Sequence, residues 1–200
     1  FAGEFAGEIA GEGSGTMAAN LGTEALVRTL LDALDAPVVA AGGLMDGADI
    51  ARMLALGACA AQLGTAFVAC PESSASRRHR ARLLAAGKRP SQHTADVTMT
   101  ADMGDTAMTS LISGRPARGF VENWEEALGG SADAASVPAY PVAYDAGKAL
   151  AAAADAAGSR AFDVLWAGTG APRARSLPAA ALMRQLADEL RVARAGNAPA

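Results

Sequence analysis

The stretch PVVAAGGLMDGADIARMLALGACAAQLGTA, residues 37–66, decides the fold that we predict for this chain. It opens with a short apolar run that contains two β-branched residues and ends in Gly42-Gly43. Such a run, stopped by glycines, is typical of a buried strand in a parallel sheet. A second short apolar run, residues 60–63, also ends in a glycine and predicts another strand of the same kind.

A helix is expected between these two strands. Asp46 stands at the N-cap position of the segment 47–56, in which apolar residues recur at helical spacing. Gly57 ends the segment, as glycine often does at a helix C-terminus. The order strand, helix, strand with short connections is the repeating unit of a parallel α/β fold.

Outside this stretch the pattern predicts more helices than strands. Thr23 is the expected N-cap of a helix over residues 22–35. Residues 1–15 repeat a four-residue unit that favours neither helix nor strand, so we divide the chain into a low-complexity segment, 1–20, and an α/β part, 21–200. The remaining expectations are a basic surface helix at 72–89, a loop-rich region at 90–119, a linker at 129–141, an alanine-rich helix at 142–158 and an amphipathic helix at 178–194.

The two glycine-containing strand ends are candidates for an anion site. In parallel α/β proteins, ligands bind at the carboxyl ends of the strands, and glycines there let backbone amides approach a phosphate closely. Gly42-Gly43 and Gly64-Thr65 have this placement, and each is followed by a predicted helix N-terminus that favours negative charge. The alternative is that these glycines only close tight strand-to-helix turns. The chain has neither a Gly-x-Gly-x-x-Gly fingerprint nor a Gly-Lys-Ser/Thr loop.

Composition excludes several classes of function. The formal net charge is −4, and no basic stripe with interleaved aromatic residues is present, so we expect no nucleic-acid partner. Two cysteines, Cys59 and Cys70, predict neither a disulfide framework nor a metal site. The sequence shows no transmembrane stretch and no signal peptide, so we expect a cytoplasmic protein without a membrane partner.

Four blocks of the sequence resemble the nitronate monooxygenase family, formerly called 2-nitropropane dioxygenases. The blocks occur in the family's order and are PVVAAGGLMDGADIARMLALGACAAQLGTAFVACPES (37–74), SGRPARGFVENW (113–124), VPAYPVAYDAGKAL (137–150) and FDVLWAGTGAPRARSLPAAALMRQLADEL (162–190). The resemblance implies the C-terminal part of an FMN-binding (β/α)8 TIM barrel with additional helices, the N-terminal strands being missing. A complete barrel of this kind usually needs about 250 residues.

The resemblance also implies a reaction and a set of site residues. The family oxidises alkyl nitronates with O2 to carbonyl compounds and nitrite. By resemblance, the FMN phosphate is held by Gly42, Gly43, Gln62, Leu63, Gly64 and Thr65, and the residues near the flavin are Tyr140, Tyr144 and Lys148. The last three are spaced to share one face of a helix, where two phenols and an ammonium group could bind an anionic nitronate. Judged from the residues alone, a packed helix with a surface lysine is the alternative.

The sequence departs from the family pattern at the catalytic histidine. The family carries this residue in a Gly-Gly-His-x-Gly loop, and the matching stretch here, residues 9–15, reads IAGEGSG. Glu12 is the titratable residue in that stretch, whereas His79 and His93 are expected on the surface. Two other hypotheses therefore stay open: an FMN-dependent NAD(P)H:quinone or enoyl-thioester reductase of the same barrel class, and a non-catalytic remnant.

Overall fold

A computed structural model describes residues 21–86, 106–128 and 136–196 of the chain. The predictions for residues 1–20 and for the segment around His93 lie outside the described residues. The chain divides into two compact units. The first unit comprises residues 1–88 and 170–200, and the second unit comprises residues 89–169.

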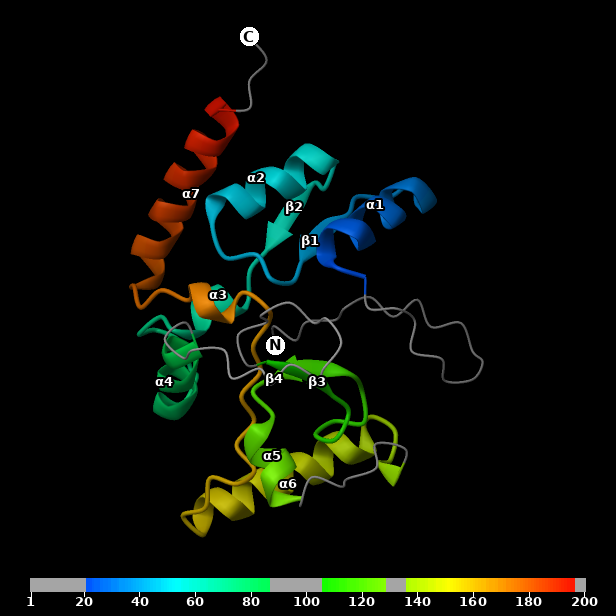
Figure 1. The fold of residues 1–200 in the computed structure, drawn as a ribbon, viewed down its shortest axis with the longest axis vertical. Coiled ribbons are helices and arrows are strands. Elements are labelled where there is room, and N and C mark those ends of the chain that lie inside the picture. The colour runs from blue at the N-terminus through cyan, green and yellow to red at the C-terminus, as the bar shows by residue number, and fades with distance from the viewer. Residues whose placement is uncertain (1–20, 87–105, 129–135, 197–200) are drawn as a thin grey trace, which may run out of the picture. The chain divides into compact units, whose positions relative to one another are not determined.

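The first unit alternates helices with two short strands (Figure 1). β1 and β2 pair in parallel with Ala41 opposite Gln62, which confirms the predicted strand–helix–strand order. The predicted caps of α2 are also confirmed, because the Asp46 side chain accepts a hydrogen bond at its N-terminus and Gly57 is left-handed at its C-terminus. The elements are α1 (Thr23–Ala33), β1 (Val39–Ala41), α2 (Gly47–Leu56), β2 (Ala60–Gln62), α3 (Thr65–Val68), α4 (Arg77–Ala86), η2 (Ala171–Arg173) and α7 (Ala179–Gly196).

The strands are less buried than the sequence predicted. Ala40 is buried and packs with Val27 of α1 and Met53 of α2. The neighbouring Val39 side chain points to the other face and is 52% exposed. In the part of the chain that the structure describes, this sheet has two strands, and its helices cover one face. Strands that are buried on both faces need a second layer, so alternate positions of β1 stay exposed.

Helix α7 packs against α2 and completes the core of the first unit (Figure 1). Leu182 and Leu186 of α7 are buried together with Met45 and Cys70. The two helix backbones approach so closely at Gly47 that a Cβ atom there would lie 2.2 Å from the amide nitrogen of Leu190. Glycine at this position therefore allows the contact between α2 and α7.

The second unit contains a small antiparallel sheet where the sequence predicted a loop-rich region. β3 (Ala107–Thr109) pairs with β4 (Ala117–Gly119), and Gly119 forms a further bridge to Trp166. Over residues 106–119, the described part of that region, the prediction missed these two strands because each has only three residues, too few to show an alternating pattern. The helices of this unit are α5 (Glu122–Ala127) and α6 (Val142–Ala156), and α6 confirms the predicted alanine-rich helix.

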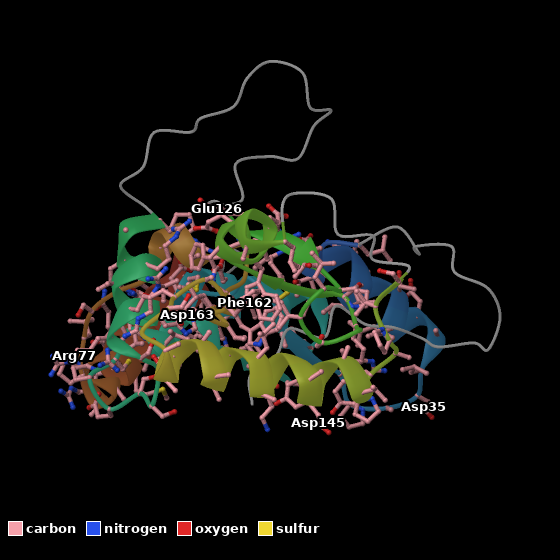
Figure 2. All side chains as sticks on the ribbon, turned by 90° about the horizontal axis from the view of Figure 1, so that it is seen from below. Asp35, Arg77, Glu126, Asp145, Phe162 and Asp163 are labelled. Carbon is pink, nitrogen blue, oxygen red and sulfur yellow. The ribbon has the colours of Figure 1, made fainter. Side chains whose placement is uncertain are left out.

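Trp124 of α5 organises the core of the second unit. Its indole Nε1 donates a hydrogen bond of 3.0 Å to the carbonyl oxygen of Asp163, and its ring packs edge-on against Phe162 at 5.2 Å between centroids. Figure 2 labels both partners. α6 approaches the same core through Gly147, where a Cβ atom would lie 2.5 Å from the Ile112 carbonyl oxygen. Asp145 lies on the exposed side of α6 (Figure 2).

Candidate functional site

The first glycine loop follows β1 and has a backbone conformation that favours glycine. Gly42 has φ = 112° and Gly43 has φ = 69°, both in the left-handed region. A side chain at either position would cost about 1–2 kcal/mol from the clash between Cβ and the carbonyl group. Both residues are half-buried. Glycine at both positions therefore allows the main chain to take this turn at the end of β1.

The second glycine loop follows β2 and leaves the sheet at the same edge as the first. Because Ala41 pairs with Gln62 in a parallel ladder, the residues after both strands emerge side by side. Helix α3 begins at Thr65, and its N-cap, Gly64, supplies no side-chain hydrogen bond. The structure thus brings the two predicted phosphate loops together.

Gln62 and Leu63 differ in what they can contribute to a ligand site. Gln62 is exposed at the end of β2. The Leu63 side chain is half-buried and packs against both hydrophobic clusters of the first unit. Leu63 can therefore contribute to a ligand site through its backbone, whereas Gln62 can also offer its amide group.

The N-terminus of α2 is less open to an anion than the sequence suggested. The amide of Gly47 donates a hydrogen bond of 2.9 Å to Glu189, and the amide of Asp49 donates one of 2.8 Å to Asp46. Two carboxylates therefore already occupy the first turn of the helix, where partial positive charge is concentrated. A phosphate at this end of the sheet would depend on the amides of the glycine loops rather than on the helix terminus.

Asp49 is a buried carboxylate at the back of the first loop, with only 4% of the residue exposed. It accepts hydrogen bonds from the Met45 amide at 2.8 Å and from Arg52 at 2.6 Å, and it forms an ion pair of 2.8 Å with Arg173. Burial alone raises the pKa of Asp49, but the Met45 amide and the Arg173 guanidinium outweigh it and hold that pKa below its ordinary value. Asp49 is therefore ionised at neutral pH.

Two arginines from the segment after Gly170 contact the first loop, and we call them the arginine pair. Arg173 donates a hydrogen bond of 2.8 Å to the Gly43 carbonyl oxygen and forms an ion pair of 2.9 Å with Asp46. Arg175 donates a hydrogen bond of 2.6 Å to the carbonyl oxygen of Met45. The arginine pair thus holds backbone that lies 130 residues earlier in the chain.

Arg175 also binds a carboxylate of α7. Its Nη1 atom lies 2.6 Å from Glu189, which in turn accepts the Gly47 amide. Burial raises the pKa of Glu189, but the hydrogen bonds from Gly47 and Arg175 outweigh it, so the pKa lies below its ordinary value. From the sequence alone, no role was assigned to the arginine pair. The signal available was the presence of two arginines at alternate positions just before the last helix.

Thr23 has a different role from the one predicted. The N-cap of α1 is Gly22, which forms no side-chain cap, and Thr23 is the first helical residue. The Thr23 hydroxyl donates a hydrogen bond of 2.9 Å to the carbonyl oxygen of Gly42. Thr23 lies one position after the N-cap, so its hydroxyl is not placed to accept the free amides of α1, and it donates to the glycine loop instead.

Tyr140, Tyr144 and Lys148 are brought together in the second unit. The two tyrosine rings lie 5.7 Å apart between centroids, and Lys148 Nζ lies 5.1 Å from the centre of the Tyr144 ring. Tyr140 precedes the first residue of α6, so the three do not share one helix as the spacing suggested. Arg115, which sequence reasoning did not assign, stacks on the Tyr140 ring at 5.4 Å. The result is a row of two phenols between two cations.

Of the two histidines and the glutamate named in the sequence analysis, the structure describes one histidine. His79 lies in α4 and is half-buried rather than fully exposed on the surface. Glu12 and His93 lie outside the described residues. Within the described ranges, no group of three or more His, Cys, Asp or Glu side chains could hold a metal ion. No helix in the same ranges is long and apolar enough to cross a membrane.

Comparison with known proteins identifies the family. The family profile described as nitronate monooxygenase matches residues 3–189. The chain belongs to the nitronate monooxygenase family. It is 48% identical over 171 residues to the nitronate monooxygenase of Paraburkholderia phytofirmans and 47% identical over 175 residues to that of Pseudomonas aeruginosa. Each match covers 86% of this chain but only 42% and 45% of the two relatives, so the chain spans less than half of their length.

Solved structures confirm the predicted fold class for this nitronate monooxygenase family member. A nitroalkane oxidase from Streptomyces ansochromogenes is 39% identical with a TM-score of 0.72, and the match covers 89% of this chain and 46% of that one. FabK from Thermotoga maritima is 22% identical with a TM-score of 0.62, covering 87% and 50%. This second likeness concerns the fold alone. Together with the partial coverage, these matches identify the α/β fold as part of a TIM barrel.

Proposed function

We propose that this chain supplies the FMN phosphate site and part of the substrate site of an enzyme that oxidises alkyl nitronates with O2 to carbonyl compounds and nitrite. The observation that carries the proposal is the pair of glycine loops at the ends of two adjacent parallel strands. Membership of the nitronate monooxygenase family supports it.

The residues present fit a phosphate group. Gly42 and Gly43 have left-handed backbone that lets main chain approach an anion, and Gly64 and Thr65 form a second turn at the same edge. Gln62 would add a side-chain amide donor, and Leu63 would add its backbone alone. Such a site recognises a phosphate by oriented N–H groups without a lysine or arginine contact.

Bound FMN would supply the redox chemistry between the nitronate and O2. The chain's own contribution to the substrate is the row of Tyr140, Tyr144 and Lys148. A nitronate carries its negative charge on two oxygen atoms, and the Lys148 ammonium and the phenolic hydroxyls are donors suited to them. These groups would bind and orient the anion. The expectations of a cytoplasmic location and of no nucleic-acid partner stay predictions from composition.

A spectroscopic experiment tests the proposal. The chain is purified, desalted and examined for the visible absorption of oxidised flavin, and oxygen uptake is then followed after adding an alkyl nitronate. We expect retained flavin, oxygen uptake with the nitronate and little reduction of the flavin by NADH. Rapid reduction by NADH would favour the reductase alternatives, and a colourless protein that does not take up added FMN would contradict the proposal.

A further inference from the structure

The first glycine loop is held along its whole length by side chains outside it. Between residues 42 and 46, each of the four peptide groups forms a hydrogen bond with a side chain. The carbonyl oxygens of Gly42, Gly43 and Met45 accept bonds from Thr23, Arg173 and Arg175, and the Met45 amide donates one to Asp49. Two of these bonds come from Arg173 and Arg175 of the C-terminal segment. Gly170, at the start of this segment, also touches the loop, because a Cβ atom there would lie 2.9 Å from the Gly43 carbonyl oxygen.

Holding a carbonyl group also fixes the next amide. The peptide unit is planar and trans, so its C=O and N–H bonds point in opposite directions. The bond from Arg173 to the Gly43 carbonyl oxygen therefore turns the amide of Leu44 to the opposite side of the loop. Donors that are already oriented bind an anion without the cost of ordering the loop.

We propose that Arg173 is a positioning residue that holds the Gly42–Gly43 loop in its phosphate-binding conformation. It acts through the Gly43 carbonyl and not by contact with the phosphate. This inference rests on the proposed function, because it concerns the same FMN site. It assigns to the C-terminal segment a part in cofactor affinity in addition to its part in the fold.

The contacts of Arg173 distinguish this role from a simple attachment of α7. α7 is attached to the first unit by its own buried residues, Leu182 and Leu186, and by the bond from Gly47 to Glu189. The partners of Arg173 are the loop carbonyl and the two carboxylates at the start of α2. Its bonds therefore converge on the loop and the start of α2 rather than on α7.

Linkage makes the coupling reciprocal. If the docked arginine favours the phosphate-binding loop, then bound phosphate favours the docked arginine by the same factor. FMN should therefore protect the C-terminal segment from local opening, whereas riboflavin, which lacks the phosphate, should protect it less.

The experiment compares two flavins on two variants. Dissociation constants for FMN and riboflavin are measured by flavin fluorescence quenching for the unaltered chain, for Arg173→Gln and for Arg191→Gln. Arg191 is the control because it is an exposed arginine that pairs with Asp188 on α7. We expect Arg173→Gln to weaken FMN binding roughly tenfold or more, the change that corresponds to one hydrogen bond to a charged group. Riboflavin binding should stay within about twofold, and the control should change neither affinity.

The outcomes separate this inference from the function on which it rests. Equal losses for FMN and riboflavin, or no loss for FMN, would overturn the positioning role while leaving the phosphate site in place. No preference of the unaltered chain for FMN over riboflavin would overturn the phosphate site and the coupling together. If Arg173→Gln does not fold, Arg173→Lys replaces it in the experiment. Lysine keeps the charge but lacks the planar fork that reaches three partners, so we expect the same loss of FMN affinity. Amide exchange at Leu44 with FMN bound gives an independent readout, and it should be faster in either Arg173 variant than in the unaltered chain.

Discussion

Arg173 donates a hydrogen bond of 2.8 Å to the carbonyl oxygen of Gly43, a residue that precedes it by 130 positions. This bond joins the segment before the last helix to the loop after the first strand. The two glycines of that loop have φ values of 112° and 69°. A conformation of this kind is costly for residues other than glycine, and four side-chain contacts hold the loop in it.

Gly43→Ala should weaken both the fold and the cofactor site. The added Cβ disfavours the left-handed backbone, and we expect a loss of about 1–2 kcal/mol in the free energy of unfolding. FMN affinity should fall as well, because the loop amides would turn. Urea unfolding and FMN titration measure the two effects. Gly158→Ala is the matched control, since Gly158 also has positive φ, 73°, with nothing within 4 Å of its Cβ position; an equal loss of FMN affinity there would argue against the site.

Asp49→Asn should reduce stability in a way that depends on pH. The folded-state pKa of Asp49 lies below its ordinary value of 3.8, so its ionised form stabilises the fold above that value. This contribution is lost as the pH falls through the folded-state pKa. We expect the variant to lose about 2 kcal/mol at pH 7 and the difference from the unaltered chain to shrink below about pH 4. Urea unfolding at several pH values checks this, and a difference that does not change with pH would contradict it.

Gly47→Ala should separate α7 from α2. Alanine normally suits the first turn of a helix, but here its Cβ atom would lie 2.2 Å from the backbone of Leu190. Overpacking of this kind costs about 1–3 kcal/mol. Limited proteolysis should then cut near α7 sooner than in the unaltered chain. Gly196→Ala is the control, because Gly196 ends α7 and a Cβ atom there would have nothing within 4 Å. This variant should be neutral, and equal behaviour of the two variants would contradict the packing argument.

Lys148→Met should raise KM for an alkyl nitronate more than it lowers kcat. The variant keeps the length of the side chain but removes the ammonium group beside the Tyr144 ring. The loss of one charge-assisted contact corresponds to roughly a tenfold rise in KM. Steady-state oxygen uptake gives both constants. Arg160→Gln removes a surface cation of the same unit that pairs with Asp155, and KM should not change there; a similar rise in both variants would point to general electrostatics instead.

Local patterns were sufficient to predict the strand–helix–strand unit. Asp46 and Gly57 marked the ends of α2 because caps depend on neighbouring residues, and the structure has both. The short pairing of β3 with β4 was missed because three-residue strands carry no periodic signal. The exposure of Val39 was missed because burial depends on what covers a sheet and not on the strand itself.

The candidate site was predictable only in part, and for the same reason. The glycine loops are marked by glycines next to strand ends, whereas the arginine pair acts across 130 residues, a separation over which sequence spacing gives no guide. Thr23 looked like a helix cap, and only the fold brings its hydroxyl to the Gly42 carbonyl. Arg115 was similarly hidden, because it stacks on a ring that lies 25 positions later in the chain, beyond β4 and α5.

The most direct test of the central claim, that the glycine loops bind the phosphate of FMN, is the phosphorus NMR spectrum of FMN titrated with the chain. We predict that the phosphorus resonance shifts on binding to the unaltered chain and that the shift is lost or much reduced with Gly43→Ala, while Gly158→Ala behaves like the unaltered chain. An unchanged shift with Gly43→Ala, or no shift with the unaltered chain, would contradict the account.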